Sequence, residues 1–163
     1  MRNFKSCRKI RGLKSARPLS EPPSRFKTSP KLKGSRAKGK TYERLVGRKL
    51  KRRIENGELN ADLVSERWFA FEDDNGFGYC QIDHYLVCPG FIVLIECKLT
   101  QTDSAEDQLK KLYEPILRKV YECPVITVQV CKNLRRHPAN ALGDIRDIIE
   151  YPRAGLWTWH FIG

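Results

Sequence analysis

The stretch from Phe91 to Leu99, Phe-Ile-Val-Leu-Ile-Glu-Cys-Lys-Leu, constrains the fold of this chain more than any other part. Its five consecutive apolar residues predict a strand that is buried on both faces. Glu96 and Lys98 then follow, and strand alternation places both on one face. Charges at the end of a buried strand are costly unless they are paired or bind an ion. This end of the strand is therefore a candidate site.

A preceding hairpin supplies a second carboxylate. Residues 79–88 predict a strand, and Pro89-Gly90 predicts the turn that follows it. A two-residue turn sets Cys88 against Phe91 and brings Asp83 directly opposite Glu96, whereas a longer loop or a bulge shifts this register by one or two residues. Like charges facing each other across a ladder are unfavourable, and a divalent cation would reverse the sign of the interaction.

Strand alternation also predicts which side chains of residues 79–88 share a face. One face would hold Gln81, Asp83 and Tyr85, and the other Cys80, Ile82, His84 and Leu86. His84 then faces away from Asp83, which predicts a core or interface histidine.

Carboxylate oxygens at this position suit Mg²⁺, with Mn²⁺ as a substitute. A divalent cation held by Asp83 and Glu96 could orient a phosphodiester, and Lys98 could serve the attacking water or offset phosphoryl charge. The alternative is a salt bridge at the edge of the sheet, in which Lys98 pairs with Glu96 or Asp83.

The remaining patterns predict helices and strands around this hairpin. A chain of 163 residues suffices for one domain with a core. Strands reached through helices after the hairpins predict an α/β fold, a mixed sheet covered by helices. The expected helices are 41–56, 103–121 (kinked or divided at Pro115) and 140–150, and the further strands are 67–72, 125–130 and 155–161.

The positive charge is concentrated in one part of the chain. Residues 1–40 hold 14 Lys and Arg side chains and one acid, Glu21, whereas residues 41–163 hold 17 basic and 18 acidic side chains. Residues 1–39 are also rich in Pro, Gly and Ser, which predicts a disordered basic arm that contacts nucleic acid, followed by a folded domain over 40–163. A solvated tail is the other interpretation of such an arm.

The helix expected over 41–56 has one apolar and one basic face. Glu43 flanks the apolar stripe, and an acid in the first turn is also what the helix dipole favours. The basic face predicts contacts with DNA phosphates. Arg135 and Arg136 could also contact phosphate from their loop, and an ordinary exposed loop charge is the equal alternative. The basic helix residues expected to bind DNA are Arg44, Arg48, Lys49 and Arg52.

The six cysteines include no CxxC pair, so a structural zinc site is not expected. Most lie in or beside strand-like runs, which predicts buried free thiols and a reducing compartment, the cytoplasm of a bacterial or phage-infected cell or a nucleus. No apolar run reaches the length of a membrane span, and no secretory leader is visible, so no membrane partner is expected.

Asp83, followed after 12 residues by Glu96-Cys97-Lys98, resembles the motif of the PD-(D/E)XK nuclease superfamily. Ile82 stands where the motif's name has proline. The element order over 41–133 resembles that family's αβββαβ restriction-endonuclease-like core, and the spacing is similar to that of small phage nucleases and archaeal-type Holliday-junction resolvases. Glu43 matches an extra acid that many members carry on the preceding helix.

The resemblance implies roles for these residues. Asp83, Glu96 and the Cys97 carbonyl would bind metal, Lys98 would serve the nucleophilic water, and Glu43 would bind or orient a second metal or its waters. Relatives also place a Gln or Lys on the helix after the motif strand. The candidates here are Gln101, Gln108 and Lys111.

Together these observations predict a Mg²⁺-dependent DNA endonuclease, with a homodimer expected because symmetric cleavage of two strands needs two sites. No recognition domain stands outside the core, which favours structure-selective or weakly sequence-specific cleavage. The alternatives are a sequence-specific homing or restriction-like endonuclease, and a non-catalytic basic nucleic-acid-binding protein.

Overall fold

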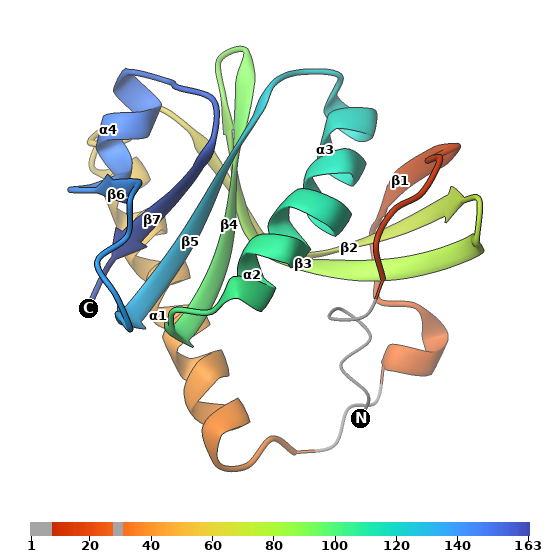
Figure 1. Cartoon of the computed structure of the whole chain (residues 1–163), viewed down its shortest axis with the longest axis horizontal. Coiled ribbons are helices and arrows are strands. Elements are labelled where there is room, and N and C mark those ends of the chain that lie inside the picture. The colour runs from red at the N-terminus through yellow and green to blue at the C-terminus, as the bar shows by residue number, and fades with distance from the viewer. Residues whose placement is uncertain (1–7, 28–30) are drawn as a thin grey trace.

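The computed structural model describes residues 8–27 and 31–163, and its centre is a seven-stranded mixed sheet in the order β1-β2-β3-β4-β5-β7-β6. Neighbouring strands from β1 to β4 are antiparallel, and β4, β5, β7 and β6 are parallel (Figure 1). The strands are β1 (Ser15–Leu19), β2 (Asp62–Asp73), β3 (Gly76–Cys88), β4 (Phe91–Thr100), β5 (Val125–Asn133), β6 (Ala141–Leu142) and β7 (Leu156–His160). The prediction of an α/β protein with a mixed, helix-covered sheet is confirmed.

Helices cover both faces of this sheet (Figure 1). Helix α1 (Ser35–Glu55) packs on one face, where Val46 and Leu50 meet Val93 and Ile95 of β4. The other face is covered by α2 (Asp103–Gln108), the π-helical segment η3 (Leu109–Tyr113) and α3 (Glu114–Tyr121). Helix α4 (Ile145–Glu150) lies on the α1 side. Strand β4 is thus buried on both sides, as its apolar run predicts.

The prediction of a disordered arm over 1–39 is wrong for much of that segment. Strand β1 pairs with β2 from Ser15 opposite Glu72 to Leu19 opposite Trp68, and the 3-10 turn η2 (Ser24–Phe26) follows it. Helix α1 begins at Ser35, six residues before the expected start. A strand in this position is formed because β2 offers an unpaired edge, and the Pro18 it contains is tolerated on an edge strand. Residues 1–7 and 28–30 lie outside the described part of the chain.

The expected division of the 103–121 helix occurs through a π-helical segment. Pro115 has no N–H, so the carbonyl of Lys111, four residues earlier, loses its helical donor. The N–H of Glu114 donates instead to the Leu109 carbonyl, five residues back, and the free Lys111 carbonyl accepts the N–H of Ile10 at 2.8 Å. Proline thus shifts the phase of the helix and also provides an attachment for the N-terminal segment.

The side-chain alternation of the β2–β3 hairpin shifts by one residue partway along its strands. Cys80 and Ile82 of β3 pack in the core on the α3 side, and so does Tyr85, whereas Leu86 packs on the α1 side. The expected grouping of Cys80 and Ile82 with Leu86 is therefore wrong, because the alternation shifts by one residue around Asp83. The partner strand shifts at the same row, where Glu66 has a left-handed φ of 52°.

The free cysteines of the described residues are Cys80, Cys88, Cys97, Cys123 and Cys131, and none of these five forms a disulfide. No helix within residues 8–27 and 31–163 is long and apolar enough to cross a membrane.

Candidate active site

The β3–β4 hairpin has the register that a two-residue Pro89-Gly90 turn predicts. Cys88 pairs with Phe91, and the ladder continues to His84 opposite Ile95. Gly90 takes a φ of 84°, which glycine adopts without steric strain. The predicted two-residue turn is therefore confirmed. Continued by one pair, this register would set Asp83 opposite Glu96, but the described ladder ends at His84 and Ile95.

Asp83 lies where β3 and β4 cease to pair with each other. Its side chain is buried, and Oδ2 accepts the backbone N–H of Cys97 at 3.2 Å. The carboxylate thereby replaces a ladder carbonyl as the acceptor for β4. This bond fixes the Asp83 carboxylate beside the Glu96-Cys97-Lys98 backbone.

Glu96 and Lys98 share the face of β4 that looks toward η3, because Ile92 and Leu94 on the same alternation pack there. The Glu96 carboxylate is only 3% exposed. Lys98 Nζ lies 3.3 Å from Glu96 Oε1, with its own side chain 28% exposed. The strand thus places the buried Glu96 carboxylate in contact with the Lys98 ammonium, which reaches solvent.

Glu43 approaches from α1 on the other side of the sheet and is 9% exposed. Lys40 Nζ bridges Glu43 Oε1 and Glu66 Oε1, at 2.8 Å each. Hydrogen bonding to Lys40 lowers the pKa of Glu66. The site therefore includes two residues that sequence reasoning missed, Lys40 and Glu66, since a lysine in a basic segment and an acid within a strand carry no distinctive pattern.

His84 holds this part of α1 against the sheet. Its Nε2 donates to the Glu43 carbonyl at 2.8 Å, so in the neutral ring Nδ1 accepts from Ser65 Oγ at 2.7 Å. A Cβ at Gly47 would stand 2.7 Å from His84 Cε1, so only glycine allows the ring this close. The prediction of a core histidine is confirmed, and its position shows that it locates the backbone of Glu43.

The carboxylates of Glu43, Asp83 and Glu96 affect the pKa values of the same two neighbouring side chains, Cys97 and Tyr113. Burial first, and then the charges of Asp83, Glu96 and Glu43, raise the pKa of the Cys97 thiol well above its ordinary value. Burial, followed mainly by Glu96 and Asp83, likewise raises the pKa of Tyr113. Glu43, Asp83 and Glu96 are thus close enough to perturb the same groups, although they come from α1, β3 and β4.

Tyr113 is a further candidate site residue. Its side chain is fully buried at the end of η3, and among the described residues its hydroxyl has no hydrogen-bond partner. A buried hydroxyl without a partner is costly, and a ligand oxygen would satisfy it. The sequence pattern assigns Tyr113 to the apolar helix stripe, and its buried hydroxyl without a partner among the described residues is what distinguishes it.

The three accessory candidates occupy different environments. Gln101 is buried, and its Oε1 accepts the N–H groups of Arg135 and Arg136 at 3.2 and 3.3 Å, so it supports that loop. Lys111 pairs with Asp107 at 2.9 Å on the exposed surface. Gln108 is buried at the end of α2, and its Oε1 is without a hydrogen-bond partner in the described part of the chain. Of the three, Gln108 has the amide available for a ligand.

Basic side chains surround the site at greater distance. The four α1 residues predicted to contact DNA are exposed, and a groove of about 660 Å³ beside α1 is lined by Arg44, Arg48 and Lys51 together with His84. Arg53 instead pairs with Asp144.

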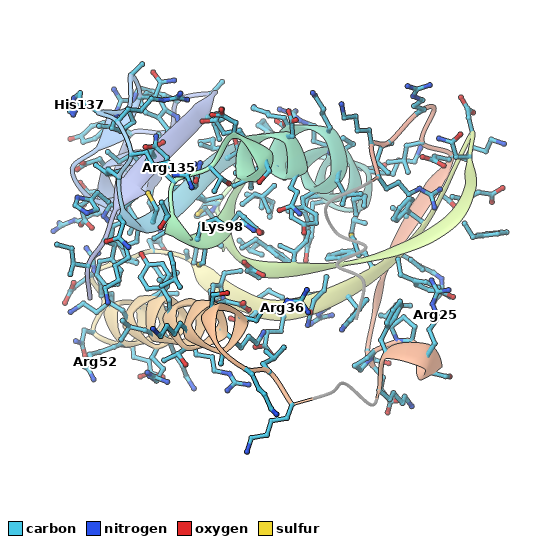
Figure 2. The ribbon with its side chains drawn as sticks, turned by 60° about the horizontal axis from the view of Figure 1, so that its bottom comes forward. Arg25, Arg36, Arg52, Lys98, Arg135 and His137 are labelled. Carbon is cyan, nitrogen blue, oxygen red and sulfur yellow. The ribbon has the colours of Figure 1, made fainter. Side chains whose placement is uncertain are left out.

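Figure 2 shows Lys98 near the centre of the view, between Arg36 and Arg135. Arg136 binds Asp103 at 2.8 Å, and the Arg135 side chain is exposed.

The donor atoms of the site are hard oxygens. Within residues 8–27 and 31–163, no three His, Cys, Asp or Glu side chains are gathered into a metal-binding group. A smaller donor set does fit Mg²⁺, which takes one or two carboxylates and keeps several waters. Asp83 and Glu96 are two such carboxylates on adjacent strands, with the Cys97 carbonyl between Glu96 and Lys98 in the chain.

Comparison of the chain with protein-family models, with curated proteins and with solved structures finds no match.

Proposed function

We propose that this protein is a metal-dependent DNA endonuclease that hydrolyses phosphodiester bonds. The observation that carries the proposal is the hydrogen bond from the Cys97 amide to Asp83, in a register that brings Asp83 beside Glu96 and Lys98. Two buried carboxylates and a partly exposed lysine at the end of one hairpin are suited to holding a cation and a phosphate together.

The side chains have separate tasks in this proposal. Asp83 and Glu96 hold Mg²⁺ or Mn²⁺, which when bound supplies Lewis-acid polarisation of the phosphate. Lys98, whose ammonium lies against Glu96 and reaches solvent, orients the attacking water and offsets the charge of the phosphoryl oxygens. Glu43 adds negative charge from α1, where Lys40 holds its carboxylate. Tyr113 donates its hydroxyl to a ligand oxygen.

The resemblance of Asp83 and Glu96-Cys97-Lys98 to the PD-(D/E)XK motif supports the same function. The order α1, β2, β3, β4, the α2–α3 helices and β5 is compatible with the αβββαβ core of that superfamily. Under this proposal, Glu43 is the additional acid of the helix that precedes the hairpins.

DNA affinity comes from the exposed basic side chains in this proposal. Arg44, Arg48, Lys49 and Arg52 of α1 neutralise phosphates on one side of the site. Arg135 and Arg136 do so on the other, in a loop that Gln101 supports. Phosphate contacts do not read sequence, so we propose structure-selective or weakly specific cleavage by a homodimer.

The test is cleavage of supercoiled, single-stranded and four-way-junction DNA in Mg²⁺, Mn²⁺ and EDTA. We expect metal-dependent cleavage that Asp83→Ala and Lys98→Ala each reduce by about 100-fold or more. Asp107→Ala and Lys132→Ala, which remove exposed charges elsewhere, are the matched controls and should cleave like the wild type.

Two results would overturn the proposal. The first is the absence of metal-dependent cleavage of every substrate. The second is cleavage that persists unchanged in Asp83→Ala and Lys98→Ala. DNA binding without cleavage would instead identify a non-catalytic nucleic-acid-binding protein.

A further inference from the structure

The outer half of the β2–β3 hairpin, with β1 on its edge, forms a three-stranded sheet whose two faces differ. One face packs Phe69, Phe71, Cys80 and Ile82 into the core against η3 and α3. On the other face, Phe77 is 79% exposed and Tyr79 is 36% exposed. Exposed aromatic side chains that stand next to each other on one sheet face, unlike scattered ones, often mark a surface that meets a partner.

The register shows which residues share this second face. Tyr79 pairs with Ala70, which pairs in turn with Arg17. The small Ala70 therefore separates an aromatic ring on β3 from a guanidinium on β1. In the adjacent row Phe77 pairs with Glu72, which contributes one acid, and Glu72 pairs with Ser15.

The turn η2 adds a planar cation to the same face. Phe26 stacks on Trp68, with ring centroids 5.0 Å apart and planes 15° apart, and meets Tyr79 edge-on at 6.4 Å. Arg25 lies over the Phe26 ring at 4.7 Å and over the Tyr79 ring at 5.5 Å. Figure 2 shows Arg25 at the η2 end of the molecule. Arginine and aromatic side chains together form the surface on which unpaired bases stack.

This face runs along β3 toward Asp83, one member of the candidate active site. Phe77, Tyr79 and Gln81 point the same way along β3, and Asp83 is the next residue of that alternation, where the strand changes face. The Gln81 amide donates to the Glu66 carbonyl at 3.3 Å, at the row that contains Asp83. At roughly 3.4 Å per residue, Tyr79 stands about 14 Å along the strand from Asp83.

We propose that the face formed by Phe77, Tyr79, Arg17 and Arg25 binds the unpaired bases of a single-stranded nucleic acid, by stacking on the rings and by phosphate contacts to the arginines. Residues 8–27, which build its edge, hold seven Lys and Arg side chains and one acid, so the charge suits a polyanion. The inference deepens the proposed nuclease function by naming the substrate as a single strand or a duplex with an unpaired segment. The binding itself requires no metal.

The experiment measures fluorescence anisotropy of the full chain with three labelled DNAs, in EDTA so that no cleavage occurs. The three DNAs are a mixed-sequence single strand, an abasic strand of the same length and charge, and the fully paired duplex. We expect the wild type to prefer the base-containing strand to the abasic strand. Phe77→Ala and Tyr79→Ala should each weaken binding of the base-containing strand by about 5- to 100-fold and should leave the abasic strand unaffected.

Salt dependence separates stacking from phosphate contacts. Phe77→Ala and Tyr79→Ala should keep the slope of log K against log salt, whereas Arg17→Ala and Arg25→Ala should each reduce it by about 0.7. Tyr151→Ala removes a 72% exposed aromatic side chain outside this face and is the matched control. Phe77 is exposed enough that its removal should preserve folding. Phe77→Ala therefore tests base stacking by itself if Tyr79→Ala does not fold.

Three results would overturn this inference, and the first two are equal binding of abasic and base-containing strands by the wild type and wild-type affinity in Phe77→Ala. An equal loss of single-strand and duplex binding in that variant would also contradict it. Because these measurements are made without metal, they stand apart from the cleavage test. Stacking without any cleavage would refute only the nuclease proposal.

Discussion

Asp83 Oδ2 accepts the N–H of Cys97 at 3.2 Å, so a side chain continues the ladder where the backbones of β3 and β4 part. Asp83→Asn keeps an oxygen acceptor for this N–H and removes the charge. We expect its unfolding free energy to remain within about 1 kcal/mol of the wild type. We expect metal-dependent cleavage to fall by about 100-fold or more. Urea unfolding and a cleavage assay measure the two quantities.

Asp83→Leu is the comparison variant for that prediction. It removes both the acceptor and the charge, so the unfolding free energy should also decrease, by about 1–3 kcal/mol. Equal stability of Asp83→Leu and Asp83→Asn would show that the Cys97 hydrogen bond contributes nothing to folding.

Tyr113→Phe should lower cleavage without lowering stability. The variant removes a buried hydroxyl that has no hydrogen-bond partner among the described residues, so we expect the unfolding free energy to be unchanged or higher by about 1 kcal/mol. If the hydroxyl donates to a bound ligand, cleavage should decrease by about 10-fold or more. Unchanged cleavage would leave Tyr113 with a packing role alone. Tyr85→Phe, which removes a hydroxyl bonded to Tyr121 at 2.7 Å, is the control that should lower stability.

The two glycines of α1 should respond oppositely to alanine. Gly→Ala within a helix ordinarily stabilises by about 1 kcal/mol, and Gly39, where an added Cβ would meet no described atom within 4 Å, should follow this rule. At Gly47 the added Cβ would stand 2.7 Å from His84, so we expect a loss of about 1–3 kcal/mol. Thermal unfolding of both variants checks the difference. A stabilised Gly47→Ala would contradict the close approach of His84 to α1.

Asp73 anchors the N-terminal segment and should make that anchorage depend on pH. Burial opposes its ionisation, but hydrogen bonds from Arg8 and from the N–H groups of Arg11 and Asn75 lower the pKa of Asp73 below its ordinary 3.8. A carboxyl whose pKa is lowered on folding stabilises the protein above its unfolded pKa, which is close to that ordinary value, and this contribution is lost as the pH falls through the folded value.

Asp73→Asn should therefore lower the unfolding free energy at pH 7 by about 1–3 kcal/mol. The difference from the wild type should shrink progressively below pH of about 4. Denaturant unfolding over a pH series measures both effects, with the exposed neighbour in Asp74→Asn as the control. A difference that stays constant at acid pH would mean that the ionised pair with Arg8 is not its source.

The hairpin that carries the site was predictable because two strong local signals agree. The apolar run that begins at Phe91 predicts a central strand, and Pro89-Gly90 predicts a turn, and the two-residue alternative for that turn gives the register that the hairpin adopts. The placement of Glu43 followed from the apolar stripe of α1, on which Tyr42 and Val46 are buried. These features depend on residues close to one another in the chain.

The features that the sequence did not reveal depend on contacts between distant residues, or on a shift in strand alternation or helix periodicity. Strand β1 has no alternating apolar pattern, since its conformation is stabilised by the edge of β2. The change of face at Asp83 coincides with a left-handed Glu66, a residue that does not mark such a conformation as glycine would. Tyr113 reads as one more member of a helix stripe until Pro115 shifts that helix into a π-helical turn.

Strand β1 has one further consequence for how this protein can be handled. It pairs with the outer edge of β2 from Trp68 to Glu72, so its removal would leave that edge of the 12-residue strand without a partner strand. A long free edge of this kind invites pairing with a second molecule. Removing the basic N-terminus to reduce nonspecific affinity for nucleic acid would thus expose this edge of β2, and the shortened chain would tend to aggregate. The position of such a truncation should therefore be chosen by the solubility of the product rather than by its charge.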